Sequence, residues 1–420
     1  MTAADASTSF VVAVFCAVYV GMALGRWPGL KIDRTGIAIL GGIVLYTSGE
    51  MAGADVLAAI DWATITLLFG LMILSAQFAV CGFYGWCSAR IAAARASPAA
   101  ILALTVLVSG LLSAVLTNDV VVFAMTPMLI QGLAARGLDA RPYLIALAGG
   151  ANAGSAATLI GNPQNILIGQ AGRLDFWEFT LVCTPPALLG LVSVFAVVWL
   201  VWRRRFTRAA GQAAGGPGPE LVIPSVDRFG MGKAVLAAAA LLAMFATHLP
   251  HVTGVLIIAG LLLLNRQVPT RDMLGFVDWH LLALFAGLFV VTAALARTGL
   301  PAELLRDVST GTPGWPGLAA LVPLTLVGSN TIGNVPIVVL LLAVLKSLSA
   351  DTLYALAVLS TLAGNLLVVG SLANIIVVER ARQSDVALGF AEHARCGVPM
   401  TLLSIAGAVA WLAARPLLGL

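Results

Sequence analysis

The sequence predicts an all-α polytopic membrane protein made of two inverted repeats, and three observations lead to this fold class. Of the 420 residues, 60% are hydrophobic and only 10% are charged, whereas a soluble domain has about 25% charged residues. The apolar residues form runs of the length that membrane-crossing helices need, about 20 residues. Landmark residues of the first half recur in the same order in the second half. This composition excludes a water-soluble enzyme, a disordered chain and a nucleic-acid-binding protein.

Ten apolar segments are expected to cross the membrane, five in each half: residues 9–25, 34–48, 62–83, 141–170 and 177–202, then 231–248, 251–265, 278–299, 352–379 and 396–415. Two further apolar segments, 98–136 and 315–348, are interrupted near their middle by polar residues. We expect each of these two to form a re-entrant hairpin, which enters and leaves the membrane on the same side.

The distribution of basic residues predicts the orientation of the chain. If both termini lie outside, 18 of the 23 Lys and Arg residues face the cytoplasm, and the other five are Arg173, Arg297, Arg306, Lys346 and Arg415. Such a bias is what the positive-inside rule requires. We therefore expect a multi-pass protein of the inner (cytoplasmic) membrane, in contact with the lipid bilayer, with both termini outside.

The two halves are predicted to be repeats joined by a cytoplasmic linker. The first repeat covers residues 1–202, the linker 203–230, which is rich in Arg, Gly and Pro, and the second repeat 231–420. Asp61 and Asp278, each followed by Trp and expected to begin a helix, are one pair of landmarks. Because five crossings per repeat is an odd number, the second repeat must be inverted. Inverted repeats with broken helices are typical of secondary transporters.

Polar residues interrupt the two hairpins and also the two crossings 141–170 and 352–379, which we expect to be discontinuous helices. Unwound carbonyls suit Na⁺, while free amides at a half-helix start suit an anion. Asn118 and Asn334 are expected to cap the second arms of the hairpins. Pro163 suits an early position of its half-helix. Asp119 is the clearest carboxylate within an apolar hairpin, and we expect it to bind a cation or a proton.

Two sets of candidate residues follow from these interruptions. The residues expected to bind substrate are Asn118, Asn165, Ser329, Asn330, Thr331, Asn334 and Asn374. The residues expected to couple transport to a cation or proton are Thr117, Asn118, Asp119, Gly161, Asn162, Asn165, Gly370 and Ser371. No catalytic residue is expected, and the Cys and His residues have no metal-ligand spacing. We expect no cofactor and no metal beyond Na⁺ or H⁺ as the coupling ion.

Residues 113–127 and 155–169 resemble those of the ion transporter superfamily, which includes arsenite permeases, sodium/proton antiporters, the melanosomal P protein and the sodium-coupled dicarboxylate and citrate symporters. Residues 117–119 and 161–165 are similar to the arsenite permease and P protein branch, and residues 329–331 to the dicarboxylate symporters. The resemblance implies a citrate-transporter-like domain in which a transport domain, holding both hairpins and both broken helices, moves against a scaffold within a homodimer.

Three functions remain open at this point. The first is secondary active transport of a small inorganic oxyanion or carboxylate, coupled to Na⁺ or H⁺ by an elevator-type alternating-access mechanism. The second is Na⁺/H⁺ antiport through Asp119. The third is arsenite or antimonite efflux, for which a partner ATPase would supply energy, since the chain has no P-loop. An enzyme is not expected, because the chain lacks a recognisable catalytic dyad.

Overall fold

The computed structural model describes residues 3–415, apart from 26, 28, 95, 214–222, 224, 246, 248–249, 267, 301–302, 304–314 and 346–347. Within these ranges the regular elements are helices, as predicted. Part of the expected linker and the cations Arg26, Arg95, Arg306 and Lys346 lie outside the described residues.

The helices of the first half follow the predicted segments. They are α1 (Ala3–Leu24), α2 (Arg34–Thr47), α3 (Gly53–Ala59), α4 (Trp62–Val80), α5 (Phe83–Ala93), α6 (Pro98–Val115), α7 (Asn118–Ala135), α8 (Arg141–Ser155), α9 (Pro163–Gly172) and α10 (Phe176–Ala213). The expected hairpin 98–136 is the pair α6 and α7, and the expected broken helix 141–170 is the pair α8 and α9. The short helices α3 and α5 were not predicted, because they lie between the long apolar runs.

The long helices of the second half also follow the predicted segments. They are α11 (Arg228–Phe245), α12 (His251–Leu263), α13 (Thr270–Leu274), α14 (Trp279–Arg297), α16 (Trp315–Thr331), α17 (Asn334–Val344), α18 (Ala350–Ala363), the 3₁₀ turn η2 (Val368–Gly370), α19 (Leu372–Gln383) and α20 (Phe390–Ala414). In the described part of the chain, eight helices are long and apolar enough to cross a membrane: α1, α4, α6, α7, α10, α11, α14 and α20.

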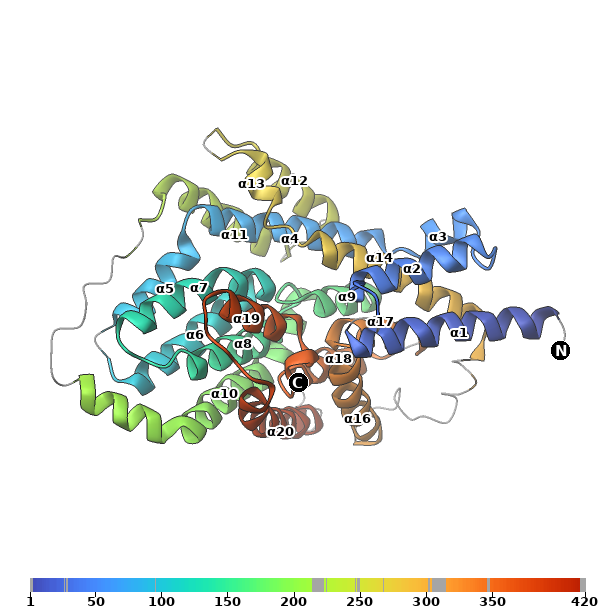
Figure 1. Ribbon diagram of the computed structural model, residues 1–420. Coiled ribbons are helices and arrows are strands. Elements are labelled where there is room, and N and C mark those ends of the chain that lie inside the picture. Colours follow the sequence, from blue (N-terminus) through green and yellow to red (C-terminus); the bar gives the residue numbers. More distant parts are fainter. Residues whose placement is uncertain are drawn as a thin grey trace.

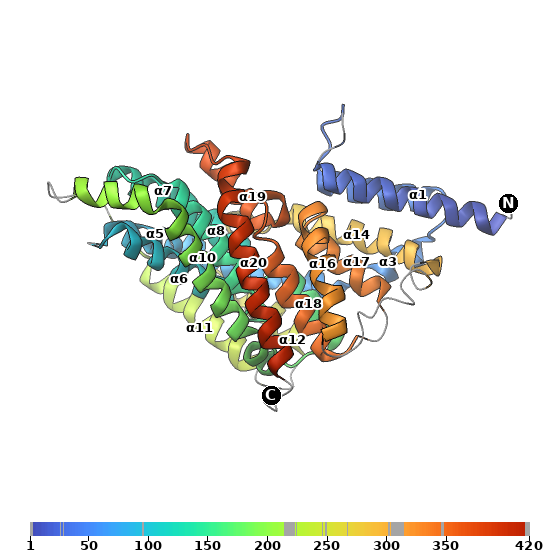
Figure 2. The same cartoon turned by 90° about the horizontal axis from the view of Figure 1, so that it is seen from below.

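The helices form two groups that each combine both halves of the chain. The wall helices are α1, α2, α4, α11, α12 and α14; α4 packs on α12 and α2 packs on α14. The core helices are α6–α10 and α16–α20, among which α6 packs on α8, α16 on α18 and α10 on α20. In Figure 1, α4, α11 and α12 run along the upper side of the molecule. Figure 2 shows the molecule from below, and in this view α10, α16 and α20 lie in front.

Several helix starts agree with the sequence prediction. The carboxylates of Asp61 and Asp278 cap α4 and α14, accepting hydrogen bonds from the backbone N–H of Thr64 at 3.1 Å and of Leu281 at 2.9 Å. Pro163 is the first residue of α9, where its missing N–H costs no helical hydrogen bond. These residues thus set the starts of two wall helices and of the core helix α9.

The capping roles predicted for Asn118 and Asn334 were wrong by one position. Each is the first residue of its helix, and the cap positions belong to Thr117 and Gly333. Gly333 has a φ of 103°, which favours glycine because it lacks a Cβ. The Asn118 side chain instead reaches across to Asn152 on α8. It is therefore available for contacts between helices.

The turn between α6 and α7 is buried within the core helices. Leu116, Thr117 and Asn118 are each 3% exposed or less, whereas a turn at a membrane surface would be exposed to water. Close packing of α6 on α8 depends on glycine: a Cβ on Gly154 would lie 2.1 Å from the carbonyl oxygen of Gly110. The two helices therefore approach backbone to backbone just before the α8–α9 interruption.

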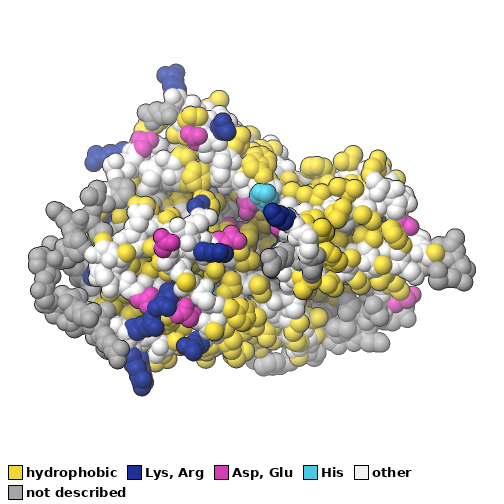
Figure 3. Space-filling view, in the orientation of Figure 1, with side chains coloured by type: hydrophobic (Ala, Val, Ile, Leu, Met, Phe, Trp, Pro, Cys, Tyr) yellow, Lys and Arg dark blue, Asp and Glu magenta, His cyan; other side chains and the backbone are white. Residues whose placement is uncertain are grey.

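The surface is divided between charged and apolar regions. On the face in Figure 3, charged side chains gather over the left part, and hydrophobic side chains cover most of the right part. Large apolar residues are exposed on the outer helices, including Ile43 on α2 (50%) and Leu181 and Val192 on α10 (66% and 64%). Contiguous exposed apolar surface is costly in water and is what contact with a lipid bilayer requires.

Candidate functional site

The candidate site lies among the core helices, where two interrupted helices meet. Residues 156–162 separate α8 from α9, and residues 364–371 separate α18 from α19. Side chains from both interruptions join in one buried hydrogen-bond network. We call it the asparagine network; its members are Asn118, Asn152, Ser155, Asn162, Asn165, Thr361, Asn365, Ser371 and Asn374, and Ser155 links Asn162 to the Asn152 carbonyl.

Asn152 on α8 is the centre of the asparagine network. Its Nδ2 donates to the Oδ1 atoms of Asn365 at 2.8 Å and Asn374 at 3.2 Å. Its Oδ1 accepts from Ser371 Oγ at 2.9 Å and from Asn118 Nδ2 at 3.3 Å. Because an amide offers two donor and two acceptor positions, the side chain is fully used. Asn152 thus joins the first hairpin to the second interrupted helix.

Asn165 and Asn162 close the first interruption. Asn165 Nδ2 donates to the carbonyls of Ser155 at 3.2 Å and Thr158 at 2.8 Å. Asn162 Oδ1 accepts from the Asn165 backbone N–H at 2.9 Å, and Asn162 Nδ2 donates to Thr361 Oγ1 at 3.3 Å. These bonds satisfy backbone groups that the interruption leaves open.

The second interruption is closed in the same manner. Asn374 Nδ2 donates to the carbonyls of Gly364 at 2.9 Å and Leu367 at 3.1 Å. Asn365 Nδ2 donates to the Gly149 carbonyl at 3.2 Å, and the backbone carbonyl of Asn365 lies 3.2 Å from Nε2 of the buried His393. The segment is therefore held from both sides despite lacking helical hydrogen bonds.

The first hairpin is fastened to both groups of helices. The backbone N–H of Asn118 donates to the Gly161 carbonyl at 3.1 Å, which places the hairpin turn beside the α8–α9 interruption. The Thr117 hydroxyl lies 3.0 Å from the Ser75 hydroxyl on α4, a wall helix. Asp119 is only 7% exposed, and among the described residues its carboxylate has no hydrogen-bond partner.

The predicted residues of the second hairpin occupy different surroundings. Asn330 donates to the carbonyls of Leu326 and Ala363, both at 2.9 Å, and its Oδ1 accepts from the Leu367 N–H at 3.1 Å. Ser329 Oγ donates to the Ser360 carbonyl at 3.3 Å. Thr331 is exposed and donates back to the carbonyls of its own helix. Asn334 is buried at the start of α17.

Four buried oxygen atoms near the first interruption have no hydrogen-bond partner among the described residues: Ser113 Oγ, Asn118 Oδ1, Gln164 Oε1 and Asn165 Oδ1. A buried acceptor without a partner is costly. Two of these residues contact Gly161 through their backbone: the Asn118 N–H donates to its carbonyl, and a Cβ on Gly161 would lie 2.8 Å from the Ser113 carbonyl oxygen. Amide and hydroxyl oxygens are suitable ligands for a hard cation.

The electrostatic character of the asparagine network is neutral. The hydrogen bonds that join it run between amides, hydroxyls and backbone groups. Among the described residues, the structure contains no cluster of three or more His, Cys, Asp and Glu residues that could hold a metal ion. The network can therefore bind a ligand through neutral hydrogen-bonding groups. The carboxylate of Asp119, which follows Asn118 in the chain, is a charged group of the same hairpin.

Sequence reasoning missed the central residue of this site. Asn152 was not among the candidates, and neither were Thr361 and Asn365. The available signal was its isolation, because residues 146–154 otherwise contain only Ala, Leu and Gly. A lone amide in such a helix needs partners inside the membrane and is a functional candidate for that reason.

The chain is similar to several known proteins. The model of the CitMHS family, described as "Citrate transporter", matches residues 19–358. A "46 kDa membrane protein" of Mycobacterium leprae is 30% identical, over 96% of this chain and 97% of its own. The "Silicon efflux transporter LSI3" of Oryza sativa subsp. japonica is 27% identical, over 90% and 91%. The crystal structure of the Alcanivorax borkumensis YdaH transporter has a similar fold, with a TM-score of 0.50 and 14% identity over 98% of each chain.

Proposed function

The chain belongs to the citrate transporter family and is a multi-pass membrane transporter, not an enzyme, and from this premise we propose that it carries a small inorganic oxyanion or carboxylate. Transport is secondary and coupled to Na⁺ or H⁺. The observation that carries this proposal is the asparagine network, in which side chains of both interrupted helices converge in the core. Substrate sites at such interruptions are a feature of secondary transporters.

The substrate is held by amides, hydroxyls and half-helix starts in this proposal. Ser329, Asn330, Thr331, Asn334 and Asn374 contribute from the second half, and Asn118 and Asn165 from the first. A site of neutral donors favours a small ligand of low charge, because a multiply charged anion in a water-poor site requires compensating charge. We therefore expect tight binding only for compact ligands.

The coupling cation occupies the first interruption in this proposal. The support is that Ser113 Oγ, Asn118 Oδ1 and Asn165 Oδ1, on residues near the first interruption, have no hydrogen-bond partner among the described residues. Thr117, Asp119 and Asn162 complete the candidate set on this side, and Gly370 and Ser371 correspond to it in the second half. A Cβ on Gly370 would lie 2.4 Å from Asn330 Oδ1, so its backbone also approaches a polar side chain closely.

We further propose that residues 1–202 and 231–420 are inverted repeats and that α6–α7 and α16–α17 are re-entrant hairpins. The buried turn at residues 116–118 supports re-entry. In the proposed repeat, α2 corresponds to α12 and α4 corresponds to α14. The contact of α4 with α12 is therefore equivalent to the contact of α14 with α2, which supports the repeat. In an elevator mechanism the core helices move against the wall helices. A homodimer through exposed apolar wall helices, with both termini outside, completes the proposal.

A flux experiment tests the proposed function. Purified protein in liposomes is given labelled phosphate, sulfate or a dicarboxylate, with an imposed Na⁺ or H⁺ gradient of either direction. We expect accumulation of one of these anions that ceases when the gradient is collapsed by an ionophore. Absence of accumulation with every anion and both gradients would refute secondary anion transport.

Efflux of an uncharged oxyacid is a second candidate, favoured by the silicon efflux transporter among the relatives. Silicic and arsenous acids are neutral at pH 7 and present hydroxyl groups that suit amide partners. Deletion in the host is then expected to raise sensitivity to arsenite or antimonite, or to raise internal silicon. An unchanged deletion strain in both assays would argue against it.

Na⁺/H⁺ antiport is a third candidate, favoured by the buried carboxylate of Asp119, which lacks a hydrogen-bond partner among the described residues. Antiport requires Na⁺-driven proton flux in liposomes without any added anion. Asp119→Asn is expected to abolish that flux, while Asp61→Asn retains a capping side chain and the flux. Proton flux that persists in Asp119→Asn would exclude this candidate.

A further inference from the structure

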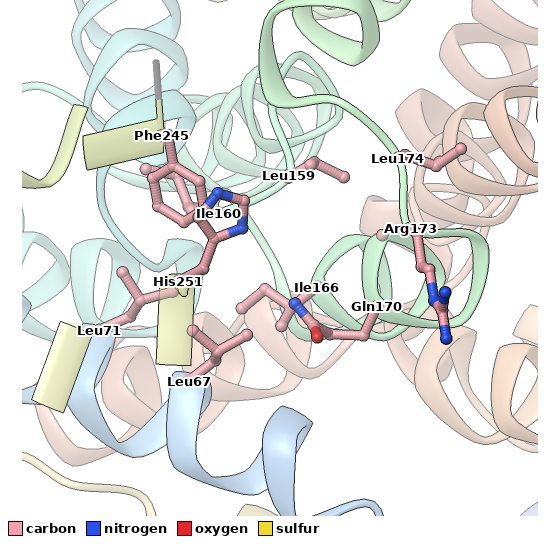
Figure 4. Close-up of a pocket in the computed structure, with 11 residues that line it drawn as sticks. Leu67, Leu71, Leu159, Ile160, Ile166, Gln170, Arg173, Leu174, Phe245 and His251 are labelled. Atoms are coloured by element: carbon pink, nitrogen blue, oxygen red, sulfur yellow. The ribbon is translucent and has the colours of Figure 1, made fainter. Parts of the chain in front are cut away.

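A cavity separate from the asparagine network lies between core and wall helices. Its volume is about 210 Å³, and it lies between α9 on one side and α4, α11 and α12 on the other. In Figure 4, Phe245 and His251 line one side and Arg173 the other, with the amide of Gln170 between them. An apolar cavity of about 150 Å³ is large enough to bind benzene. This cavity therefore has room for part of a hydrocarbon chain.

The lining changes character along the length of α9. Near the helix interruption the walls are mostly apolar and include Ile160, Ile166, Leu67 and Leu71, with the imidazole of His251 on the same side. At the other end of α9, the lining includes the amide of Gln170 and the guanidinium of Arg173. The ten residues of α9 span about 15 Å at 1.5 Å per residue. This is half the thickness of a bilayer's hydrocarbon core, which is about 30 Å.

The Arg173 end of the cavity has the features expected at a membrane–water interface. Residues 173–175 form the turn between α9 and α10, and α10 is itself long and apolar enough to cross the membrane. Trp177, in the first turn of α10, is 49% exposed, and Trp is enriched at the interface. The neighbouring Phe176 stacks on Phe245 at 4.9 Å. The cavity thus extends from the interface toward the middle of the membrane.

Arg173 supplies an available positive charge at that level. Its side chain is exposed, and among the described residues it forms no ion pair. A guanidinium binds phosphate oxygens through two parallel hydrogen bonds. The cavity thus has a cation at one end and apolar walls at the other. A phospholipid has the same order, with its headgroup phosphate at one end and its acyl chain at the other.

We propose that this cavity binds an anionic phospholipid from the leaflet on the Arg173 side. The acyl chain lies between α9 and α4, and the headgroup phosphate binds Arg173. No member of the asparagine network lines the cavity, although Leu159 and Ile160 of the first interruption do. A lipid there contacts both the core and the wall helices.

Native mass spectrometry of the purified full-length protein tests this site. The probes are phosphatidylglycerol, phosphatidylcholine with the same acyl chains, and inorganic phosphate. We expect phosphatidylglycerol to bind at least tenfold more tightly than phosphatidylcholine, and phosphate alone not to compete. Arg173→Gln removes the charge, and Leu71→Trp fills the cavity. Each is expected to weaken phosphatidylglycerol binding about tenfold.

Two matched variants serve as controls. Arg297→Gln removes an exposed cation that pairs with Asp55, and Leu181→Trp enlarges an exposed apolar residue of α10. Both are expected to bind phosphatidylglycerol like the parent protein. Equal retention in all four variants would overturn the proposal, as would full retention in Leu71→Trp alone or displacement of the lipid by phosphate. Because Arg173 is exposed, its substitution leaves folding intact and keeps the test decisive.

Discussion

Asn165 and Asn374 make the same pair of hydrogen bonds in two different helix interruptions. Each donates from Nδ2 to the carbonyls ten and seven residues earlier, Asn165 to Ser155 and Thr158, and Asn374 to Gly364 and Leu367. The bond lengths lie between 2.8 and 3.2 Å in all four cases. Asparagine here replaces the amide donors that a continuous helix would supply. Asn165 and Asn374 thus have the same structural role in the two halves, which supports the proposed repeat.

Asn152→Ala is expected to impair both stability and transport. The substitution removes a side chain that forms four hydrogen bonds within the fully buried network, and each unsatisfied buried partner costs roughly 1–3 kcal/mol. Partial rearrangement limits the loss, so we expect the free energy of unfolding to fall by about 2–4 kcal/mol. Chemical denaturation in detergent measures it.

A matched control for this variant is Ser193→Ala, whose hydroxyl only bonds back to the carbonyl of Leu189. It is expected to change the free energy of unfolding by less than about 0.5 kcal/mol. If Asn152→Ala unfolds at the same denaturant concentration as Ser193→Ala, the central position assigned to Asn152 is wrong.

Gly161→Ala is expected to disrupt the first interruption. A Cβ at this position would lie 2.3 Å from the carbonyl oxygen of Ser155, and backbone cannot move away as a flexible side chain can. Strain at a functional backbone position costs roughly 1–3 kcal/mol. We therefore expect Gly161→Ala to lose more than about 90% of transport activity. Flux per folded molecule in liposomes is the measurement.

Gly260→Ala on α12 is the control, because nothing lies within 4 Å of a Cβ there. Alanine also favours a helix over glycine by about 1 kcal/mol. This variant is expected to keep full activity. Equal activity of the Gly161 and Gly260 variants would contradict the close approach at the interruption.

The length of the apolar runs was sufficient to predict the long helices, and the polar residues within two of the runs were sufficient to predict the two interruptions. Asp61 and Asp278 were predictable as helix starts, because a carboxylate at the N-cap has a local role. The asparagine network was only partly predictable. Asn165 and Asn374 lie just after the two interruptions, which polar residues and glycine mark in the sequence. Asn152 lies within a regular helix, and its partners come from helices distant in sequence, so only the tertiary structure identifies its role.

An ion-pair cluster at the α7–α8 turn predicts a pH dependence of stability. Burial alone would raise the pKa of Asp139, but hydrogen bonds from Arg141 and Arg205 hold it below its usual value of 3.8. A lowered pKa in the folded state means that the stabilisation is fully present above pH 3.8 and is lost as pH falls through the folded-state pKa. Asp139→Asn is therefore expected to lower the free energy of unfolding by about 1 kcal/mol at pH 7.

The difference between Asp139→Asn and the parent protein should become smaller as pH falls below 3.8. Denaturation curves at pH 7, 5 and 3 measure it. Asp272→Asn on α13, a carboxylate without an ion pair among the described residues, is the control and should show no such trend. A deficit of Asp139→Asn that is unchanged at pH 3 would mean that the carboxylate charge is not its cause.

The contact between Ser75 and Thr117 tests the proposed movement of core against wall helices. Ser75 lies on α4 and Thr117 in the first hairpin, with their hydroxyls 3.0 Å apart. Cysteines at these two positions should form a disulfide, because side chains this close bring their Cβ atoms into range. If the core moves during transport, oxidation of Ser75→Cys/Thr117→Cys should abolish flux, and reduction should restore it. The background carries Cys16→Ser, since Cys16 is exposed.

A disulfide within one body should not have this effect. Ser349 and Thr352 lie in the core, with hydroxyls 2.9 Å apart, and cysteines there are expected to leave flux unchanged after oxidation. Flux at the full rate through the oxidised Ser75→Cys/Thr117→Cys protein would mean that hairpin and wall move together. The elevator proposal would then fail, and the substrate would have to reach both sides of the membrane by gating around a fixed core. The asparagine network could still bind the substrate in that mechanism.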